Sequence, residues 1–264
     1  MTESPTSAGL SPARSEDIEV ARGAVALAGT LEAPAVAAGE HVPLVILMHG
    51  FTGSQDEPVI RATAQSLLDA GIASIRFDFD AHGDSTGEMV NMTVPAEIED
   101  ARAVYDFVRT LPFVSDVGLL GHSQGGVVAA MLAGQLQDKA SALVLLAPAT
   151  SIRDSAREGD ILGARFDPDD PPPSITVFGF ELGRDYILTA QTLPVREVPA
   201  RFTGPVSLVQ GEADALLPVS LAMDYAGIFA DSQLRLLPEQ DHDFYHDPDQ
   251  PAAIAADFFS QHLH

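Results

Sequence analysis

The chain has 264 residues, 46% of them hydrophobic, enough for one large domain or two small ones with a substantial buried core. Its 38 acidic residues outnumber the 14 basic ones, and the resulting net charge of −24 argues against nucleic acid or an anionic membrane as a partner. The chain has no cysteine, which excludes disulfides and thiolate metal sites.

Residues 1–15 are rich in Ser, Thr, Pro and Ala, and we expect them to form a disordered tail. They lack the basic start and apolar stretch of a secretory signal, and no apolar run in the chain has membrane-spanning length. The default expectation is therefore a cytoplasmic protein without membrane contact. The sequence leaves the oligomeric state open, with a homodimer as one option.

Beyond residue 16, short apolar runs alternate with segments of helical spacing. Residues 17–22 and 24–31 are expected to form an antiparallel pair of strands. Continuous apolar runs predict strands buried on both faces at 42–48, 72–77, 116–120, 142–146, 206–210 and 233–237. Helices are expected at 59–70, 95–111, 127–136, 220–229 and 251–262. The alternation predicts an α/β fold with a mostly parallel sheet covered by helices on both faces.

One stretch, residues 149–201, breaks this alternation. It contains Asp-Pro-Asp-Asp-Pro-Pro-Pro at 167–173 and Phe-Gly-Phe at 178–180. A long irregular segment inside a compact domain is usually functional. We interpret it as a cap that lies over a site and is inserted between two core segments, 16–148 and 202–264.

Gly121-His122-Ser123-Gln124-Gly125 follows a short apolar run and precedes a helical run of small residues. A strand, a tight turn with glycine on both flanks of a serine, and a helix together provide the context of a nucleophile elbow, which exposes the serine hydroxyl above the sheet. The alternative interpretation is a serine that only caps the helix.

A serine hydroxyl needs a base, most often a histidine held by a carboxylate. Asp214 is the candidate acid, because it follows the strand at 206–210 and functional groups gather at the carboxyl ends of parallel strands. Glu212 is its local rival. His242, after the strand at 233–237, is the candidate base, and the alternative is a surface histidine that neutralises an acidic loop.

An oxyanion hole needs two backbone N–H groups aimed at the developing negative oxygen. Gln124, the residue after the serine, is one expected donor. Phe51 is the other, in the loop His49-Gly50-Phe51-Thr52-Gly53-Ser54 after the first buried strand.

The segment Asp78-Phe79-Asp80-Ala81-His82-Gly83-Asp84 alternates carboxylates with a histidine, a composition that could hold a metal. Its spacing matches no complete metal-binding loop, so we predict no metal site here. A structural loop that braces the site, with Asp80 and His82 hydrogen-bonded inside it, is the preferred interpretation.

Together these motifs resemble the α/β-hydrolase family and, more narrowly, the bacterial cinnamoyl or feruloyl esterases. The narrower likeness depends on Arg76 to Ser85, on Ala190-Gln191-Thr192-Leu193-Pro194 and on the cap, and the whole likeness spans 18–263. It implies hydrolysis of carboxylic esters without a cofactor, and a cap that helps to bind the phenolic acyl group. Tyr186, Asp167 and Asp170 are the residues that the likeness suggests for contacts with ring hydroxyls.

The sequence thus predicts a serine carboxylesterase that acts on a small-molecule ester through an acyl-enzyme. Ser123 is the expected nucleophile, His242 the base and Asp214 the acid. A serine peptidase or a thioesterase on the same fold remains an alternative, as does a non-catalytic binding protein that has kept all three residues.

Overall fold

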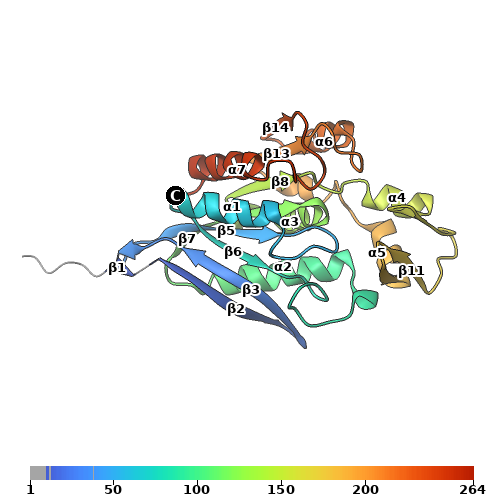
Figure 1. Ribbon diagram of the computed structural model, residues 1–264, viewed down its shortest axis with the longest axis horizontal. Coiled ribbons are helices and arrows are strands. Elements are labelled where there is room, and N and C mark those ends of the chain that lie inside the picture. The colour runs from blue at the N-terminus through green and yellow to red at the C-terminus, as the bar shows by residue number, and fades with distance from the viewer. Residues whose placement is uncertain (1–9, 12, 38) are drawn as a thin grey trace, which may run out of the picture.

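The structure is a computed structural model that describes residues 10–11, 13–37 and 39–264 (Figure 1). The predicted disordered tail therefore lies largely outside the described residues. The described part of 1–15 includes a two-residue strand, β1, which pairs with β4, and the start of β2.

An eight-stranded sheet forms the centre of the fold, in the order β14-β13-β8-β7-β5-β6-β3-β2. Its six strands from β14 to β6 run parallel, and β3 and β2 continue the sheet in antiparallel pairing. The strands outside the inserted segment are β1 (Leu10–Ser11), β2 (Arg14–Arg22), β3 (Val25–Ala33), β4 (Val36–Ala37), β5 (Val42–Met48), β6 (Ala73–Phe77), β7 (Val114–His122), β8 (Ala142–Leu146), β13 (Val206–Gly211) and β14 (Ser232–Leu237). The α/β fold predicted from the sequence is confirmed.

Helices cover both faces of the sheet (Figure 1). Along β5, Leu44, Ile46 and Met48 belong to the core beneath α2 and α3, whereas Val45 and Leu47 pack under α1 and α7. Alternate side chains of a strand point to opposite faces, so a continuous apolar run is what a doubly covered strand requires. The helices outside the inserted segment are α1 (Pro58–Asp69), α2 (Val94–Val108), α3 (Ser123–Leu136), α6 (Val219–Ala226) and α7 (Asp249–His262), with short 3₁₀ turns η1 (Met89–Asn91) and η2 (Gln137–Lys139). A third 3₁₀ turn, η3 (Pro199–Arg201), ends the inserted segment.

The largest difference from the predicted helices lies at the elbow. Apolar spacing predicts a helix from Val127, but α3 begins four residues earlier, at Ser123. The first turn contains two glycines, which disfavour a helix in isolation. Both are fully covered by β5, the elbow and Pro148, so tertiary packing outweighs propensity here.

Residues 149–201 contain more regular structure than their sequence pattern suggests. The elements of this inserted segment are α4 (Ile152–Glu158), β9 (Asp160–Ile161), β10 (Ala164–Arg165), β11 (Ser174–Val177), β12 (Phe180–Gly183) and α5 (Arg184–Thr192), followed by η3. The four strands form two small hairpins apart from the central sheet. Figure 1 shows α4, α5 and β11 together at one end of the molecule, beyond the carboxyl end of β5.

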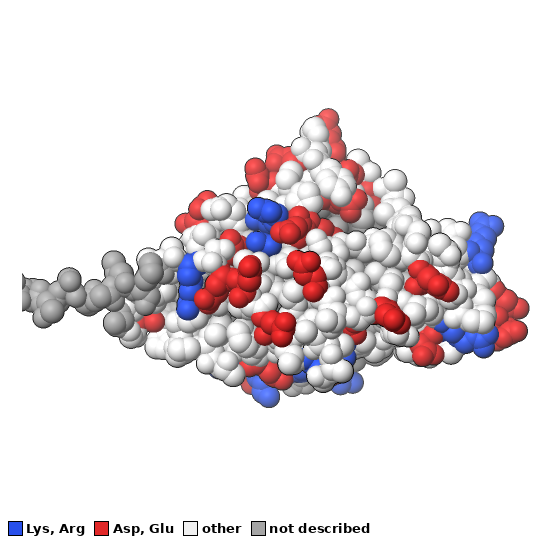
Figure 2. Space-filling model, turned by 60° about the horizontal axis from the view of Figure 1, so that its bottom comes forward, with Lys and Arg blue, Asp and Glu red and all other residues white. Residues whose placement is uncertain are grey.

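Acidic side chains are spread over the face in Figure 2 rather than gathered into one patch. In the part of the chain that the structure describes, no helix is both long enough and apolar enough to cross a membrane.

Candidate active site

The elbow holds Ser123 in a left-handed backbone conformation, with φ of 53°. Such a φ is uncommon outside glycine and stores conformational strain. The flanking glycines are required by close contact. A Cβ on Gly121 would lie 2.0 Å from the carbonyl oxygen of Gly125, and a Cβ on Gly125 would lie 2.2 Å from that of His49. Glycine is therefore needed on both sides of Ser123 because the backbone of the turn packs closely against itself and against the end of β5.

Three residues from separate loops meet at this turn. Ser123 Oγ lies 2.8 Å from His242 Nε2, and His242 Nδ1 lies 2.8 Å from Asp214 Oδ2. Because the carboxylate can only accept, the ring proton resides on Nδ1 and leaves Nε2 free to accept the serine proton. The structure thus brings together the three residues that the sequence selected, in the geometry of a nucleophile, a base and an orienting acid.

Asp214 is held by four donors. Besides His242, its Oδ2 accepts from the Gln210 side chain at 2.8 Å, and its Oδ1 accepts from the backbone N–H groups of Leu216 and Leu217, each at 2.8 Å. Burial raises the pKa of this carboxyl, but the hydrogen bonds from His242 and the backbone outweigh it and lower the pKa below its usual value. Asp214 is therefore ionised at neutral pH, whereas its rival Glu212 is exposed.

The two expected oxyanion donors border the serine. A Cβ on Gly50 would lie 3.2 Å from Ser123 Cβ, so the loop that carries Phe51 passes close enough to Ser123 to leave little room for a side chain at residue 50. Within the described residues, the Phe51 N–H donates to no other group. Gln124 lies in the first turn of α3, where backbone N–H groups have no partner within the helix.

His122 joins the loop that carries Phe51 to the loop that carries His242, a role that its position in the sequence does not indicate. Its Nδ1 lies 3.0 Å from Glu57 Oε2, and its Nε2 lies 3.0 Å from the backbone oxygen of His242. Glu57 Oε1 in turn accepts from the Gly50 N–H at 3.1 Å. Both partners of His122 are acceptors, so the ring is protonated on both nitrogens.

The pKa shifts of this pair agree with that protonation. Burial by itself lowers the pKa of His122, but the Glu57 carboxylate raises it and the net pKa lies above the ordinary value. Burial raises the pKa of Glu57, and His122 reverses that shift so that the net pKa is lowered. No spacing rule connects Glu57 with the elbow, so only the folded chain reveals the pair.

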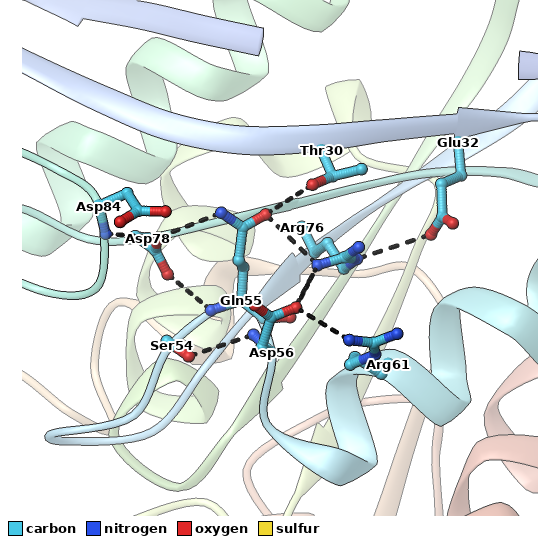
Figure 3. A network of polar contacts seen from close by, with 9 residues as sticks. All are labelled: Thr30, Glu32, Ser54, Gln55, Asp56, Arg61, Arg76, Asp78 and Asp84. Carbon is cyan, nitrogen blue, oxygen red and sulfur yellow. Dashed lines mark hydrogen bonds and ion pairs between the residues drawn. The ribbon is translucent and has the colours of Figure 1, made fainter. Parts of the chain in front are cut away.

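The acidic loop after β6 ties down the oxyanion loop (Figure 3). Asp78 accepts from the Gln55 backbone at 2.7 Å and from the Gln55 side chain at 3.1 Å, and it also accepts from the Asp84 N–H at 3.0 Å. Thr30 donates to Gln55 Oε1 at 2.8 Å, and Arg76 pairs with Asp56 at 2.8 Å. Asp78 in this loop therefore positions Gln55, and Arg76 on β6 positions Asp56, just after the segment 49–54.

Asp80 and His82 were both expected to be hydrogen-bonded inside this loop, but only His82 has its partner there, whereas the Asp80 side chain bonds to Arg22 on β2. Asp80 Oδ2 accepts from Arg22 Nη2 at 2.6 Å, and His82 Nδ1 lies 3.0 Å from the Asp80 backbone oxygen. Among the described residues, the one cluster that could hold a metal is His122, His242 and Asp243, and its imidazoles already bond to Glu57, Asp214 and Ser123. Nothing in the loop after β6 forms such a cluster.

A cavity opens beside Ser123, under the inserted segment, and we call it the inner cavity. Apolar side chains from α4, the β9–β10 hairpin and the loop after β13 line it, and they are Ile152, Ile161, Leu162, Leu216 and Leu217.

Tyr186 lines this cavity and donates to Gln124 Oε1 at 2.7 Å. The Gln124 amide donates in turn to the buried Glu97, at 3.0 and 2.8 Å to its two oxygens. Burial raises the pKa of Glu97 well above its usual value. The chain of contacts links the inserted segment to Gln124, the residue expected to donate one oxyanion N–H.

Asp167 and Asp170, the other two residues suggested for substrate contact, are exposed. Asp167 accepts from the Asp169 N–H at 3.0 Å, and Asp170 lies 4.0 Å from Arg184. Neither lines the cavity beside Ser123.

A sequence profile of the α/β hydrolase fold matches residues 43–167. The structure is similar to that of Est1E from Butyrivibrio proteoclasticus with ferulic acid bound, at 30% identity and a TM-score of 0.89, over 93% of this chain and 98% of Est1E. It shares its fold with the Pyrococcus furiosus esterase Pf2001, at 20% identity and a TM-score of 0.71, over 96% and 94% of the two chains.

A local sequence match extends to an uncharacterized 31.7 kDa protein from the traX-finO intergenic region of Escherichia coli. It is 33% identical over 86 residues, which are 32% of this chain and 30% of that protein. That match covers less than a third of either chain, whereas the likeness to Est1E covers nearly all of both. The chain belongs to the α/β-hydrolase family, and within it the structure resembles Est1E.

Proposed function

We propose that this protein is a serine carboxylesterase that hydrolyses small-molecule esters through an acyl-enzyme. The observation that carries the proposal is the chain of contacts from Ser123 through His242 to Asp214, two links of 2.8 Å each, at the mouth of an apolar cavity. A hydroxyl beside a neutral imidazole whose other nitrogen faces a carboxylate is the arrangement that activates serine.

In the proposed mechanism, Ser123 Oγ attacks the ester carbonyl as His242 Nε2 takes its proton. Asp214 stabilises the imidazolium that forms, and the N–H groups of Phe51 and Gln124 stabilise the negative oxygen of the tetrahedral intermediate. His242 then protonates the departing alcohol, which leaves the acyl group on Ser123. Water, activated by His242, releases the acid and restores the serine.

We further propose that the inner cavity takes a compact apolar or aromatic acyl group, of the cinnamoyl or feruloyl kind. Its apolar lining supports this, as does the likeness to Est1E, whose structure contains ferulic acid. Tyr186 would contact the acyl group with its aromatic ring and not with its hydroxyl, because the hydroxyl already donates to Gln124.

Replacing Ser123 by alanine tests the proposal. We expect Ser123→Ala to remain folded and to lose at least about 1,000-fold in kcat/KM on methyl ferulate and phenyl butyrate, because the nucleophile is gone. A fluorophosphonate should label the natural protein but not this variant. Ser66→Ala on α1, outside the cavity, is the matched control.

Two results would contradict the proposal. A Ser123→Ala variant that retains most of its turnover would show that the serine is not the nucleophile. Failure of the natural protein both to react with the fluorophosphonate and to hydrolyse any ester would favour a binding protein. Faster turnover of an acyl thioester or a peptide anilide would keep the mechanism but change the substrate class.

A further inference from the structure

A second hollow meets Ser123 from outside the inserted segment. We call it the outer groove, and it is bordered by the oxyanion loop, the tip of the β11–β12 hairpin and the residues just after His242. Five residues line both this groove and the inner cavity, namely Phe51, Ser123, Leu162, Leu216 and His242. The nucleophile and the base therefore stand between two hollows of different character.

Most of the large hydrophobic side chains that are exposed among the described residues line the outer groove. Eight large hydrophobic side chains are exposed among the described residues, and five of them line this groove. These five, with their exposed fractions, are Leu162 (46%), Phe178 (63%), Phe180 (42%), Leu216 (49%) and Tyr245 (62%). Single exposed apolar residues are ordinary, but a cluster around a site marks a contact surface.

The tip of the β11–β12 hairpin carries a phenylalanine, Phe178, in a backbone conformation that is unfavourable for a bulky side chain. Val177 pairs with Phe180, so Phe178-Gly179 is a two-residue turn, with φ of 51° and 88°. Such a turn favours Asn or Gly in its first position and is unfavourable for a bulky residue. Phe178 is also the most exposed of the five, so folding alone gives no reason for phenylalanine there, whereas contact with a ligand does.

The charges of the outer groove oppose a negatively charged ligand. Glu57 and Asp243 line it, and its lining includes no lysine or arginine. His122 is the one other charged side chain there, and it is already paired with Glu57 at 3.0 Å. A carboxylate or phosphate in the groove would find no free cation and would lie near Asp243 in a protein of net charge −24.

The reaction sequence assigns the two halves of an ester to the two hollows. The acyl half stays bound to Ser123 after the first step, whereas the alcohol half must leave and let water approach His242. The inner cavity, lined mostly by buried and half-buried residues, suits the half that stays, and the outer groove, lined in part by exposed side chains, suits the half that departs.

We infer that the outer groove binds the alcohol half of the substrate and selects an uncharged alcohol with an aromatic or other bulky apolar group. This inference rests on the proposed esterase function and adds the class of leaving group to it. Phe178, Phe180 and Tyr245 contact the apolar group, and Asp243 disfavours an acidic alcohol.

The test compares esters that share one acid and differ in the alcohol: the methyl, 2-phenylethyl and carboxymethyl esters of ferulic acid, and the same three esters of butyric acid. Because kcat/KM reports formation of the acyl-enzyme, it isolates the alcohol half. We expect the 2-phenylethyl ester to exceed the methyl ester about tenfold or more, and the carboxymethyl ester to fall about tenfold or more below it.

The paired variant Phe178→Ser with Phe180→Ser should bring the 2-phenylethyl ester to within about threefold of the methyl ester. Turnover of the methyl ester should change less than the 2-phenylethyl preference. Leu188→Ser with Met223→Ser is the matched control, because these two residues are also exposed apolar residues but line neither hollow.

Turnover of methyl esters without the 2-phenylethyl preference would overturn this inference and leave the esterase function standing. An equal loss on all three esters in the Phe178 and Phe180 variant would also overturn it, as would the same loss of preference in the control. If no ester is turned over and a fluorophosphonate fails to label Ser123, both the inference and the proposed function fall.

Discussion

The hydrogen-bond partners of His122 lie far from it in the sequence, so its immediate neighbours in the chain do not indicate its environment. His122 sits beside the nucleophile, buried, with one ring nitrogen on Glu57 and the other on the backbone oxygen of His242. A charged imidazole is costly to bury unless it is paired, and Glu57 provides the counter-charge. Since Glu57 also accepts from the Gly50 N–H, the pair acts as a positioning device between the oxyanion loop and the base loop.

Replacing Glu57 by glutamine should uncouple the two loops. The neutral amide no longer favours the charged imidazole, so the pKa of His122 falls and one of its two hydrogen bonds is lost. The raised native pKa means that the pair supports the fold below the unfolded histidine pKa of about 6.5, and that this support is lost as pH rises through the native value. In Glu57→Gln, kcat should fall about tenfold and its alkaline limb should move to lower pH.

The pH profile of kcat is the measurement, and Glu40→Gln on the exposed surface is the control. An unchanged alkaline limb in Glu57→Gln, even with a lower kcat, would mean that the carboxylate acts only structurally and does not hold the charge of His122.

At the scale of elements, α3 connects the elbow, the sheet and the inserted segment. Its first residues carry the proposed nucleophile and an expected oxyanion donor, and its Gln124 side chain binds both Glu97 of α2 and Tyr186 of α5. Helix α3 is buried along nearly its whole length, which explains why small residues dominate it. The geometry of the elbow thus depends on the packing of α3 against the central sheet, α2 and α5.

The turn between β7 and α3 should not tolerate a methyl group at Gly125. The new Cβ would lie 2.2 Å from the carbonyl oxygen of His49, and a backbone atom cannot rotate away. Gly125→Ala should therefore lower the free energy of unfolding by about 3 kcal/mol and displace the oxyanion loop. Urea unfolding measures the loss.

Gly227→Ala is the control for that substitution. Gly227 has φ of −66°, and its Cβ would meet its nearest neighbour at 3.5 Å, an ordinary contact. Its stability should stay the same or rise by about 0.5 kcal/mol. Equal losses in the two glycine variants would contradict the packing argument.

Helix α5 should be anchored to α3 by the Tyr186 hydroxyl. Removing it in Tyr186→Phe leaves the Gln124 carbonyl buried without its donor, which should cost about 1–2 kcal/mol. Tyr225→Phe is a matched control, because the Tyr225 hydroxyl is buried without a hydrogen-bond partner among the described residues and its loss should be near neutral. Urea unfolding of both variants checks this, and a smaller loss in Tyr186→Phe than in Tyr225→Phe would contradict it.

At the scale of the whole molecule, excess negative charge opposes the compact state. The net charge of −24 is spread over 264 residues, and repulsion between exposed carboxylates is screened by salt. The melting temperature should therefore rise by a few degrees between about 0.02 and 0.5 M NaCl at pH 7.

The control is the same salt series near pH 4.3, the isoelectric point of the sequence, where the rise should disappear. Thermal unfolding followed by circular dichroism gives both series. A melting temperature that is unchanged by salt at pH 7 would show that self-repulsion does not limit stability.

The sequence by itself determined the sheet, the helices and the three residues that meet at the elbow. Apolar runs identify strands buried on both faces, and Gly121 and Gly125 mark the turn because only glycine fits there. Asp214 and His242 follow from their positions after strands, since parallel strands end at the same edge of a sheet. These signals are local, and each is readable within a few residues.

The tertiary structure alone decided which distant side chains share an environment. Glu57 pairs with His122 across 65 positions, and Gln124 meets Tyr186 across 62, and no periodicity encodes either contact. The start of α3 and the elements within 149–201 likewise depend on packing that outweighs local preference. The physical reason is that burial and pairing energies arise only when separate segments exclude water together.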